Sequence, residues 1–176
     1  MGQQELVGPQ GLLRRFWEEG SLPSLLLWGP PGSGKTSLAR MLAVHSKRRF
    51  RFLSAVDAGV KDVRAVIEEG NGLFKPLLFL DEIHRFNKAQ QDGFLPYMED
   101  GTILLVGATT ENPSFELNAA LLSRAQVIVL ERLSPADLER LAQRAEQDLG
   151  RALPLDGFAR ETLIEMADGD GRTLLT

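Results

Sequence analysis

The sequence is poor in several features that define common classes of protein. Its 176 residues include no cysteine and only two histidines, which excludes disulfides and thiolate metal sites. A chain of this length can bury a hydrophobic core large enough to fold without disulfides or a structural metal ion. Its strictly apolar runs are short, far below the roughly 20 residues that span a membrane. Near the N-terminus, Glu5, Arg14 and Arg15 interrupt any signal-peptide core. We therefore expect a cytoplasmic protein with no membrane partner.

Excess positive charge is also lacking. The chain has 20 basic and 24 acidic residues, a net charge of -4. This balance argues against binding nucleic acid unaided, because such binding rests mainly on neutralising phosphates. The one basic cluster, residues 47–51, has two interpretations. We favour a solvated helix end, where positive charge is stabilising, over a nucleic-acid patch.

Short apolar runs alternate with amphipathic stretches over most of the chain. Continuous apolar strands separated by helices are typical of a parallel sheet covered on both faces, so we expect an α/β domain. The expected strands are 24–28, 50–54, 77–80, 103–107 and 127–130. The expected helices begin at residue 35, include 60–67, run through 87–99 and cover 119–123.

After residue 133 the pattern is helical only. Ser134 is expected to cap a helix that has Pro135 at its first position. Further helices are expected over 157–166 and from about residue 170. The expected division is an α/β domain over 1–132 and a partial helical lid over 133–176, joined by a hinge.

The segment GPPGSGKT, residues 29–36, matches the phosphate-loop pattern G-x-x-x-x-G-K-[ST], between a strand and a helix. Its glycines permit a tight loop whose backbone N–H groups surround phosphate oxygens, next to the positive end of a helix. Lys35 is expected to neutralise the β- and γ-phosphates of ATP, and the Thr36 hydroxyl to bind Mg²⁺. The expected ATP-binding residues are Gly29, Pro30, Pro31, Gly32, Ser33, Gly34, Lys35, Thr36 and Ser37.

In a second motif, LLFLDE at residues 77–82, an apolar strand is followed directly by two carboxylates. Adjacent acids repel each other and lose hydration beside a buried strand, so a positive partner is expected. Lys35 and Mg²⁺ provide it, with Asp81 as the second metal ligand. Glu82 is expected to orient and deprotonate a water for in-line attack. The acid pair therefore predicts hydrolysis as well as binding.

Polar residues also follow the fourth expected strand. Since neighbouring parallel strands end at one edge, where ligands bind, a threonine there is suited to hold the attacking water or the γ-phosphate; we favour Thr110 over Thr109. Arg124 precedes the last strand. It has two interpretations, a surface salt bridge or an arginine finger that reaches a neighbouring subunit's γ-phosphate. The histidines, His45 and His84, are far apart, and we expect His84 to pack or hydrogen-bond behind the acid pair.

In this order the segments resemble the AAA+ ATPases: phosphate loop, LLFLDE, GATTEN, LLSR and a helical lid. Within that superfamily, residues 81–125 resemble the replication-associated recombination protein A family, also called the MgsA or Werner-helicase-interacting protein family. HRFNKAQQD and ATTENPSFELN carry the likeness, which covers nearly the whole chain. It implies a P-loop NTPase fold with a five-stranded parallel sheet flanked by helices. Clamp-loader subunits and the RuvB branch-migration motor share the DEIHR segment but differ in the helix after it.

The resemblance also implies residue roles. Lys35, Thr36, Asp81 and Glu82 keep those given above. Thr110 falls at the sensor 1 position, Arg124 at the arginine finger, and Arg172 at sensor 2, which reaches from the lid to the γ-phosphate. Ser54 falls where a polar residue restrains the catalytic glutamate until DNA or a partner binds.

The chain departs from the family pattern at both ends. Of the segment of type DEVVGQ that packs around adenine, only Gly2 and Gln3 remain, and the sensor 2 helix stops at Thr176. Gly171 is also a poor helix residue. We therefore expect a fragment with a partial lid and weakened nucleotide binding.

The leading hypothesis is a Mg²⁺-dependent ATPase motor that acts on DNA at stalled or gapped replication forks. The family implies single-stranded-DNA-binding protein as a partner, a homo-tetrameric full-length form and association with the nucleoid. The alternatives are a clamp-loader-like or branch-migration subunit, and a nucleotide-gated interaction module. A small-molecule kinase is disfavoured, because Glu82, Arg124 and Arg172 suit attack by water and sensing between subunits.

Overall fold

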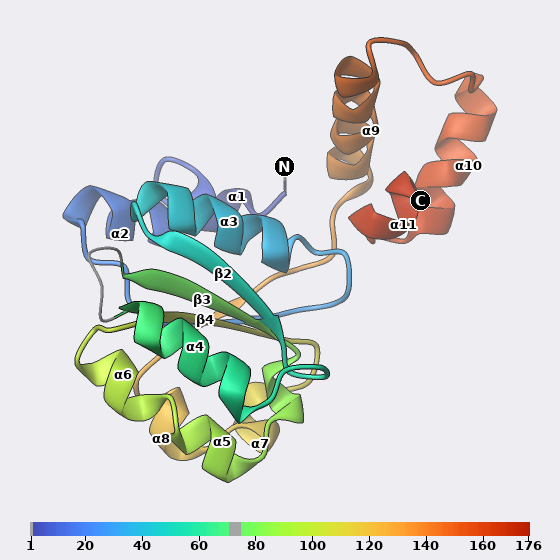
Figure 1. Cartoon of the computed structure of the whole chain (residues 1–176). Coiled ribbons are helices and arrows are strands. Elements are labelled where there is room, and N and C mark those ends of the chain that lie inside the picture. Colours follow the sequence, from blue (N-terminus) through green and yellow to red (C-terminus); the bar gives the residue numbers. More distant parts are fainter. Residues whose placement is uncertain (1, 71–74) are drawn as a thin grey trace.

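The computed structural model describes residues 2–70 and 75–176. Five parallel strands form one sheet in the order β2-β3-β4-β1-β5 (Figure 1). The strands are β1 (Leu25–Trp28), β2 (Arg49–Ser54), β3 (Pro76–Asp81), β4 (Leu104–Thr109) and β5 (Gln126–Val129). The predicted fold class, a five-stranded parallel sheet flanked by helices, is confirmed. Within the described ranges, no helix combines the length and apolarity needed to cross a membrane.

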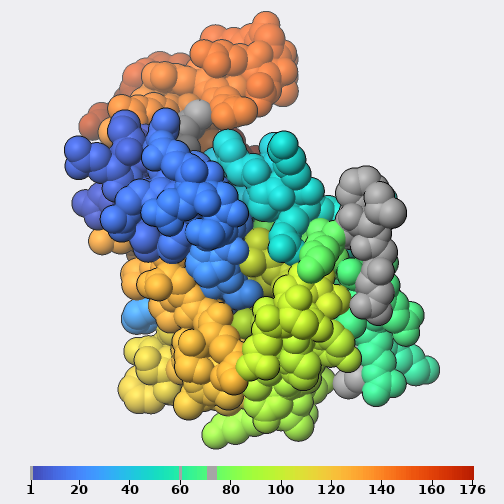
Figure 2. Space-filling model, turned by 90° about the vertical axis from the view of Figure 1, so that its left-hand side faces the viewer, coloured from blue at the N-terminus to red at the C-terminus, as the bar shows by residue number. Residues whose placement is uncertain are grey.

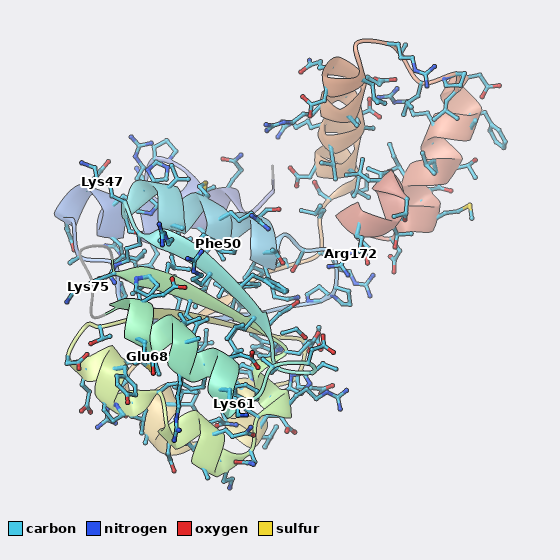
Figure 3. All side chains as sticks on the ribbon, in the orientation of Figure 1. Lys47, Phe50, Lys61, Glu68, Lys75 and Arg172 are labelled. Carbon is cyan, nitrogen blue, oxygen red and sulfur yellow. The ribbon has the colours of Figure 1, made fainter. Side chains whose placement is uncertain are left out.

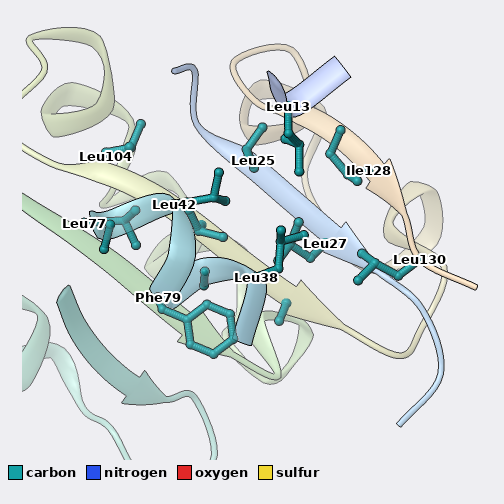
Figure 4. Close-up of a cluster of buried hydrophobic side chains, with 14 residues drawn as sticks. Leu13, Leu25, Leu27, Leu38, Leu42, Leu77, Phe79, Leu104, Ile128 and Leu130 are labelled. Carbon is teal, nitrogen blue, oxygen red and sulfur yellow. The ribbon is translucent and has the colours of Figure 1, made fainter. Parts of the chain in front are cut away.

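Helices cover both faces of the sheet. One face carries α1 (Gln4–Val7), α2 (Leu12–Glu19) and α3 (Lys35–His45), and the other carries α4 (Val60–Gly70), α5 (Lys88–Asp92), α6 (Leu95–Glu99), α7 (Pro113–Glu116) and α8 (Ala119–Leu122). On the α3 face, Leu13, Leu27 and Phe79 are fully buried in one core cluster (Figure 4). A second cluster fills the α4 face around Leu80 and Phe94. Because both faces are covered, the three central strands β1, β3 and β4 are apolar over most of their length, whereas the edge strand β2 alternates charged and apolar residues.

The single helix predicted over residues 87–99 is wrong. A 3-10 turn (Ile83–Arg85) precedes the segment, which forms two short helices, α5 and α6. Asn87 and Gln90 close a capping box that starts α5. Pro96 has no amide hydrogen to continue the helix, and the break at Phe94 turns that ring into the core, where it is fully buried.

The helices before the first strand were not predicted. In α2, Leu13, Phe16 and Trp17 share the face that packs on the first core cluster, a spacing that the helical period explains. Trp17 stacks on His45 at the end of α3, with ring centroids 4.4 Å apart. His45 is therefore engaged in packing.

The basic cluster at residues 47–51 begins after α3 and continues into β2. Arg51 pairs with Glu69 of α4 at 2.7 Å. Lys47 and Lys75 lie at the end of the sheet opposite Arg172 (Figure 3). The cluster is thus spread over a helix end and an edge strand, away from the carboxyl ends of the strands.

Three helices follow the sheet: α9 (Pro135–Leu149), α10 (Gly157–Ala167) and α11 (Gly171–Leu175). Ser134, Asp156 and Asp170 cap their N-termini, each accepting a backbone N–H. The helices have a small core of their own, made of Leu138, Ala142, Ala167 and Leu174. In Figure 1 they stand apart from the sheet and its helices, joined to them after β5.

Candidate functional site

A cavity of about 600 Å³ lies at the carboxyl ends of the strands. The strand register brings these ends together, since Trp28 pairs with Thr109, and Ser54 with Asp81. One wall comes from the loop after β1 and the acids after β3, and the other from α9 and α11. The lining residues are Pro31, Gly32, Ser33, Gly34, Lys35, Thr36, Ser37, Asp81, Glu82, Thr110, Leu133, Leu141, Arg144, Gly171, Arg172 and Leu175.

The loop after β1 has a left-handed backbone at two glycines, Gly32 (φ 66°) and Gly34 (φ 96°). Only glycine adopts such angles without strain. The Lys35 ammonium donates to the carbonyls of Gly29 at 2.7 Å and Pro30 at 2.8 Å. These two residues therefore hold the lysine through their carbonyl oxygens, while the later loop residues line the cavity.

Lys35 is buried, with 9% of its surface exposed. Burial lowers the pKa of its ammonium below the usual value, and the nearby charges of Asp81 and Glu82 oppose this effect. The positive charge of Arg172 acts in the same direction as burial. The lysine thus lies among the acid pair and the lid arginine, as the motif predicted for a group that binds phosphate.

The acid pair ends β3 with an unusual backbone. Glu82 has φ 53° and ψ 42°, a left-handed conformation that costs a non-glycine residue about 1–3 kcal/mol. Its N–H donates to Asp81 Oδ1 at 3.2 Å. The turn leaves the Glu82 side chain 35% exposed on the cavity wall. Strain at the acid next to Lys35 is consistent with a functional constraint.

Thr109 and Thr110 occupy different environments at the end of β4. Thr110 lines the cavity, whereas Thr109 is 1% exposed. The Thr109 hydroxyl lies 2.9 Å from His84 Nδ1 and accepts the Glu111 N–H at 3.0 Å. The position of Thr110 suits the role predicted for it, and that role stays a prediction.

The Ser54–Glu82 contact implied by the resemblance is not among the hydrogen bonds of the described residues. Ser54 Oγ instead accepts the N–H of Val56 at 3.3 Å. The Glu82 carboxylate lies 3.4 Å from His84 Nδ1. A histidine behind the acid therefore makes the contact that was expected from the neighbouring strand.

The lid wall meets the phosphate loop at Gly32. The Gly171 N–H donates to the Gly32 carbonyl at 3.3 Å. A Cβ at Gly171 would lie 2.9 Å from a methyl group of Leu141 and 3.0 Å from one of Leu133. Close packing thus explains a glycine where helix propensity alone disfavours one. Arg172 follows at once and points from α11 toward the α/β part (Figure 3).

Asp170 connects the cap of α11 to the same loop. Its carboxylate accepts the N–H groups of Arg172 and Thr173 at 2.7 and 3.0 Å. Burial favours a higher pKa for this carboxyl, but the hydrogen bonds and the Arg172 charge outweigh burial and lower its pKa. A Cβ at Gly32 would lie 1.8 Å from Asp170 Oδ1. Gly32 is therefore required for the lid contact as well as for the loop backbone.

Part of the lid wall was not predicted from the sequence. Arg144 and Leu141 lie one turn apart on α9, and Leu133 and Leu175 complete an apolar surface of the cavity. The i, i+3 spacing shows that Leu141 and Arg144 share a helix face. It does not show which face meets the phosphate loop.

Arg124 lies outside the cavity. It follows α8 and precedes β5, so it is close to the amino ends of the strands. Its guanidinium pairs with Glu99 and donates to the Ala120 carbonyl at 3.0 Å. The surface position is as predicted, and the observed partner is a salt bridge within the chain.

The N-terminal segment binds the connection between β5 and the lid. The Gln3 side chain donates to the Glu131 carbonyl at 2.8 Å and accepts the Glu131 N–H at 3.4 Å. The Gly2 N–H donates to Asp137 Oδ1 of α9 at 2.9 Å. Figure 2 shows this blue segment directly beneath the orange lid helices. Gly2 and Gln3 therefore join the sheet side to the lid side.

The residues of the cavity fit a nucleotide with Mg²⁺. The described part of the chain holds no cluster of three or more His, Cys, Asp or Glu side chains suited to a metal ion. Mg²⁺ does not need one, because it is commonly bound by one or two carboxylates together with substrate phosphates and water. Thr36 and Asp81 line the same cavity as the loop. They provide a hydroxyl and a carboxylate for an ion that arrives with phosphate.

Comparisons with known proteins agree with this geometry. Residues 25–133 match the family described as ATPase family associated with various cellular activities (AAA). Replication-associated recombination protein A of Coxiella burnetii is 50% identical over 99% of this chain and 41% of its own length. ATPase WRNIP1 of Dictyostelium discoideum is 45% identical over 99% of this chain and 21% of its own length.

Among solved structures, the K64R mutant of Thermotoga maritima RuvB superposes with a TM-score of 0.82. It is 27% identical and covers 99% of this chain and 60% of its own. This chain spans 41% of the length of the Coxiella burnetii relative. The predicted resemblance to the replication-associated recombination protein A family is confirmed.

Proposed function

Because the chain belongs to the AAA family of ATPases, we propose that it binds ATP with Mg²⁺ in the cavity described above and hydrolyses it. One observation carries this proposal: a single cavity is lined by Lys35 of the phosphate loop and by both acids that end β3. The loop supports binding, and the second acid supports hydrolysis.

Each residue has a distinct task in this proposal. Lys35 exchanges its bonds to the Gly29 and Pro30 carbonyls for phosphate oxygens. Thr36 and Asp81 hold the Mg²⁺, which offsets the negative charge of the β- and γ-phosphates when bound. Glu82 orients a water molecule for in-line attack on the γ-phosphorus, and one of its carboxylate oxygens accepts a proton of that water. As the water oxygen bonds to the γ-phosphorus, the bond from this atom to the bridging oxygen breaks, and ADP and inorganic phosphate leave.

Three further residues sense the γ-phosphate. Thr110 faces it from the end of β4, and Arg172 faces it from the lid. The lid, residues 133–176, is part of a helical domain that follows the α/β domain of residues 1–132. Arg124 cannot serve the cavity of its own chain, since it lies near the opposite ends of the strands. It acts as an arginine finger on the next subunit of a homo-oligomer, in which Glu99 releases it.

The substrate of the motor is DNA at stalled or gapped replication forks. The names of the relatives support replication-associated recombination, and the RuvB superposition supports branch migration as the second candidate. Single-stranded-DNA-binding protein, a tetrameric assembly and a location in the cytoplasm at the nucleoid belong to the first candidate. The net charge of -4 is consistent with DNA contact that depends on several subunits.

The ATPase rate of the intact protein, measured with forked, gapped and four-way-junction DNA, separates these candidates. Stimulation mainly by forks or gaps supports the first, and stimulation mainly by four-way junctions supports branch migration. No stimulation by any DNA favours a nucleotide-gated interaction module.

The trans role of Arg124 has its own test. Arg124→Ala and Lys35→Ala proteins are each expected to be inactive, and mixing them under subunit exchange should restore part of the ATPase rate. A site then combines both residues where an Arg124→Ala subunit provides Lys35 and its Lys35→Ala neighbour provides Arg124. If mixing restores nothing while native mass spectrometry shows mixed assemblies, Arg124 does not act between subunits.

A further inference from the structure

His84 is a nearly buried side chain beside the acid pair that the proposed chemistry leaves without a task. Its side chain is 9% exposed. One ring nitrogen, Nδ1, lies 2.9 Å from Thr109 Oγ1 and 3.4 Å from Glu82 Oε2. The same atom thus faces a buried hydroxyl on β4 and the carboxylate on the cavity wall.

The direction of the His84–Thr109 bond depends on the tautomer of the ring, and the other partners of Thr109 and the Glu82 carboxylate favour a hydrogen on Nδ1. The Thr109 hydroxyl accepts the Glu111 N–H at 3.0 Å and can donate its own hydrogen to the Glu111 carbonyl at 3.3 Å. It then has one lone pair left, which accepts from His84 Nδ1. An ionised Glu82 also only accepts. Both neighbours are therefore satisfied when Nδ1 carries the hydrogen, and a bare Nδ1 would face the carboxylate with a lone pair.

We propose that His84 is a positioning residue that couples the end of β4 to Glu82. This inference rests on the proposed ATPase function. Thr110 lines the cavity and is bonded directly to Thr109, so a ligand that moves Thr110 also moves the Thr109 hydroxyl. His84 transmits that movement to Glu82 through Nδ1.

The backbone at Glu82 explains why such a contact is needed. Its left-handed conformation, φ 53°, is unfavourable for a residue with a side chain, and no N-cap hydrogen bond from the Glu82 side chain holds the turn that follows. Glu82 is also 35% exposed, so packing does not fix its rotamer. His84 restrains the carboxylate on the wall that faces Lys35.

The test compares three His84 variants of the intact protein by steady-state ATPase kinetics. His84→Ala is expected to lower kcat by roughly 10–100-fold, the usual effect of losing a group that orients a functional side chain, with KM for ATP changed less than about threefold. His84→Asn places an amide N–H where Nδ1–H was, and should keep kcat within about fivefold of the original. His84→Gln places its amide nearer the Nε2 position and should resemble His84→Ala.

Thr109→Val tests the other end of the connection. Valine keeps the shape of the buried threonine but lacks its hydroxyl. Thr109→Val should therefore lower kcat when His84 is present, and should have little further effect when it is combined with His84→Ala. Such non-additivity is expected when two residues act through each other. Additive losses would contradict the coupling.

Two results would overturn the proposal. One is equal kcat for His84→Asn and His84→Gln, since a merely structural ring does not distinguish the two amide positions. The other is a loss that appears only in KM. If His84→Ala does not fold, the Asn and Gln pair still decides. Failure of the ATPase proposal is recognised separately, because the original protein would then hydrolyse no ATP with Mg²⁺, or Glu82→Gln would hydrolyse it at the original rate.

Discussion

The two walls of the cavity are built in different ways. On the sheet side, the phosphate loop and the acids follow strands whose core residues, such as Leu27 and Leu80, are fully buried. On the lid side, α11 is five residues long and rests on a core of four small or medium side chains. Large apolar side chains of the lid, including Phe158 and Met166, are 80% and 75% exposed.

The contacts that join the walls are few and polar. The Gly171 N–H reaches the Gly32 carbonyl, and Gly2 and Gln3 bind Asp137 and Glu131 across the connection. Hydrogen bonds of this kind contribute only about 0.5–1.5 kcal/mol each. The groups assigned to chemistry thus follow buried strands, whereas Arg172, the sensing residue of the lid, lies on a wall with a small core and few polar contacts to the phosphate loop.

The largest expected difference is in stability. Leu27→Ala should lower the free energy of unfolding by about 2–5 kcal/mol, because Leu27 is fully buried and leaves a cavity. Leu174→Ala, in the small lid core, should cost about 1–2 kcal/mol. Urea denaturation measures both. Equal losses in the free energy of unfolding would contradict the difference between the sheet side and the lid side.

The contact between the walls is tested by a matched pair of glycines. Gly32 and Gly20 have nearly the same φ, 66° and 67°, but a Cβ meets Asp170 at Gly32 and nothing within 4 Å at Gly20. Gly20→Ala should cost about 1 kcal/mol of backbone strain with ATP affinity unchanged. Gly32→Ala should add a loss of ATP affinity of roughly tenfold or more, since the loop and lid must separate.

Fluorescence titration with an ATP analogue follows both variants. Unchanged affinity in Gly32→Ala would mean that the loop does not need the lid contact.

A smaller effect is expected where charge joins the lid helices. Arg160 of α10 pairs with Glu139 at 2.9 Å and Glu146 at 2.9 Å, both on α9. Arg160→Leu should lower Tm by about 2–4 °C. Arg14→Leu is the control, because the Arg14–Glu18 pair is 49% and 63% exposed and should contribute little.

These pairs also have a pH signature. Hydrogen bonds from Arg160 lower the pKa of Glu139 and of Glu146 below their ordinary value of 4.5. A lowered folded pKa stabilises the protein above 4.5, and the gain is lost as the pH falls through the folded values. The Tm difference between the original protein and Arg160→Leu should therefore shrink below pH 4.5. A difference that grows with acid would contradict this assignment.

The positions of candidate site residues could be predicted from the sequence where the residues are consecutive and form a motif. The phosphate loop and the acid pair were placed correctly on strand ends, because their spacing and the flanking apolar runs are local. Thr110 was favoured over Thr109, and it is Thr110 that lines the cavity. The break at Phe94 was missed, because burial of that ring in the core overrides the polar helical pattern around it.

Contacts between residues far apart in the sequence could not be predicted from it. The position of His84 behind the acid pair was expected, but its hydrogen bond to Thr109, 25 residues away, was not. Ser54, which the resemblance placed near Glu82, accepts the Val56 N–H instead. Arg144 and Leu141 line the cavity because of how α9 follows β5 and contacts the N-terminal segment through Gly2. Gly171, which is a poor helix residue, is explained by packing against Leu141.

The most direct test of the account measures ATP binding and hydrolysis on the same samples of three proteins, with Mg²⁺ present. Glu82→Gln should bind ATP as the original protein does and hydrolyse it about 10²–10⁴ times more slowly. Lys35→Ala should lose binding and hydrolysis together. Undiminished ATP affinity in Lys35→Ala, or normal turnover in Glu82→Gln, would contradict the claim that these two side chains share one catalytic cavity.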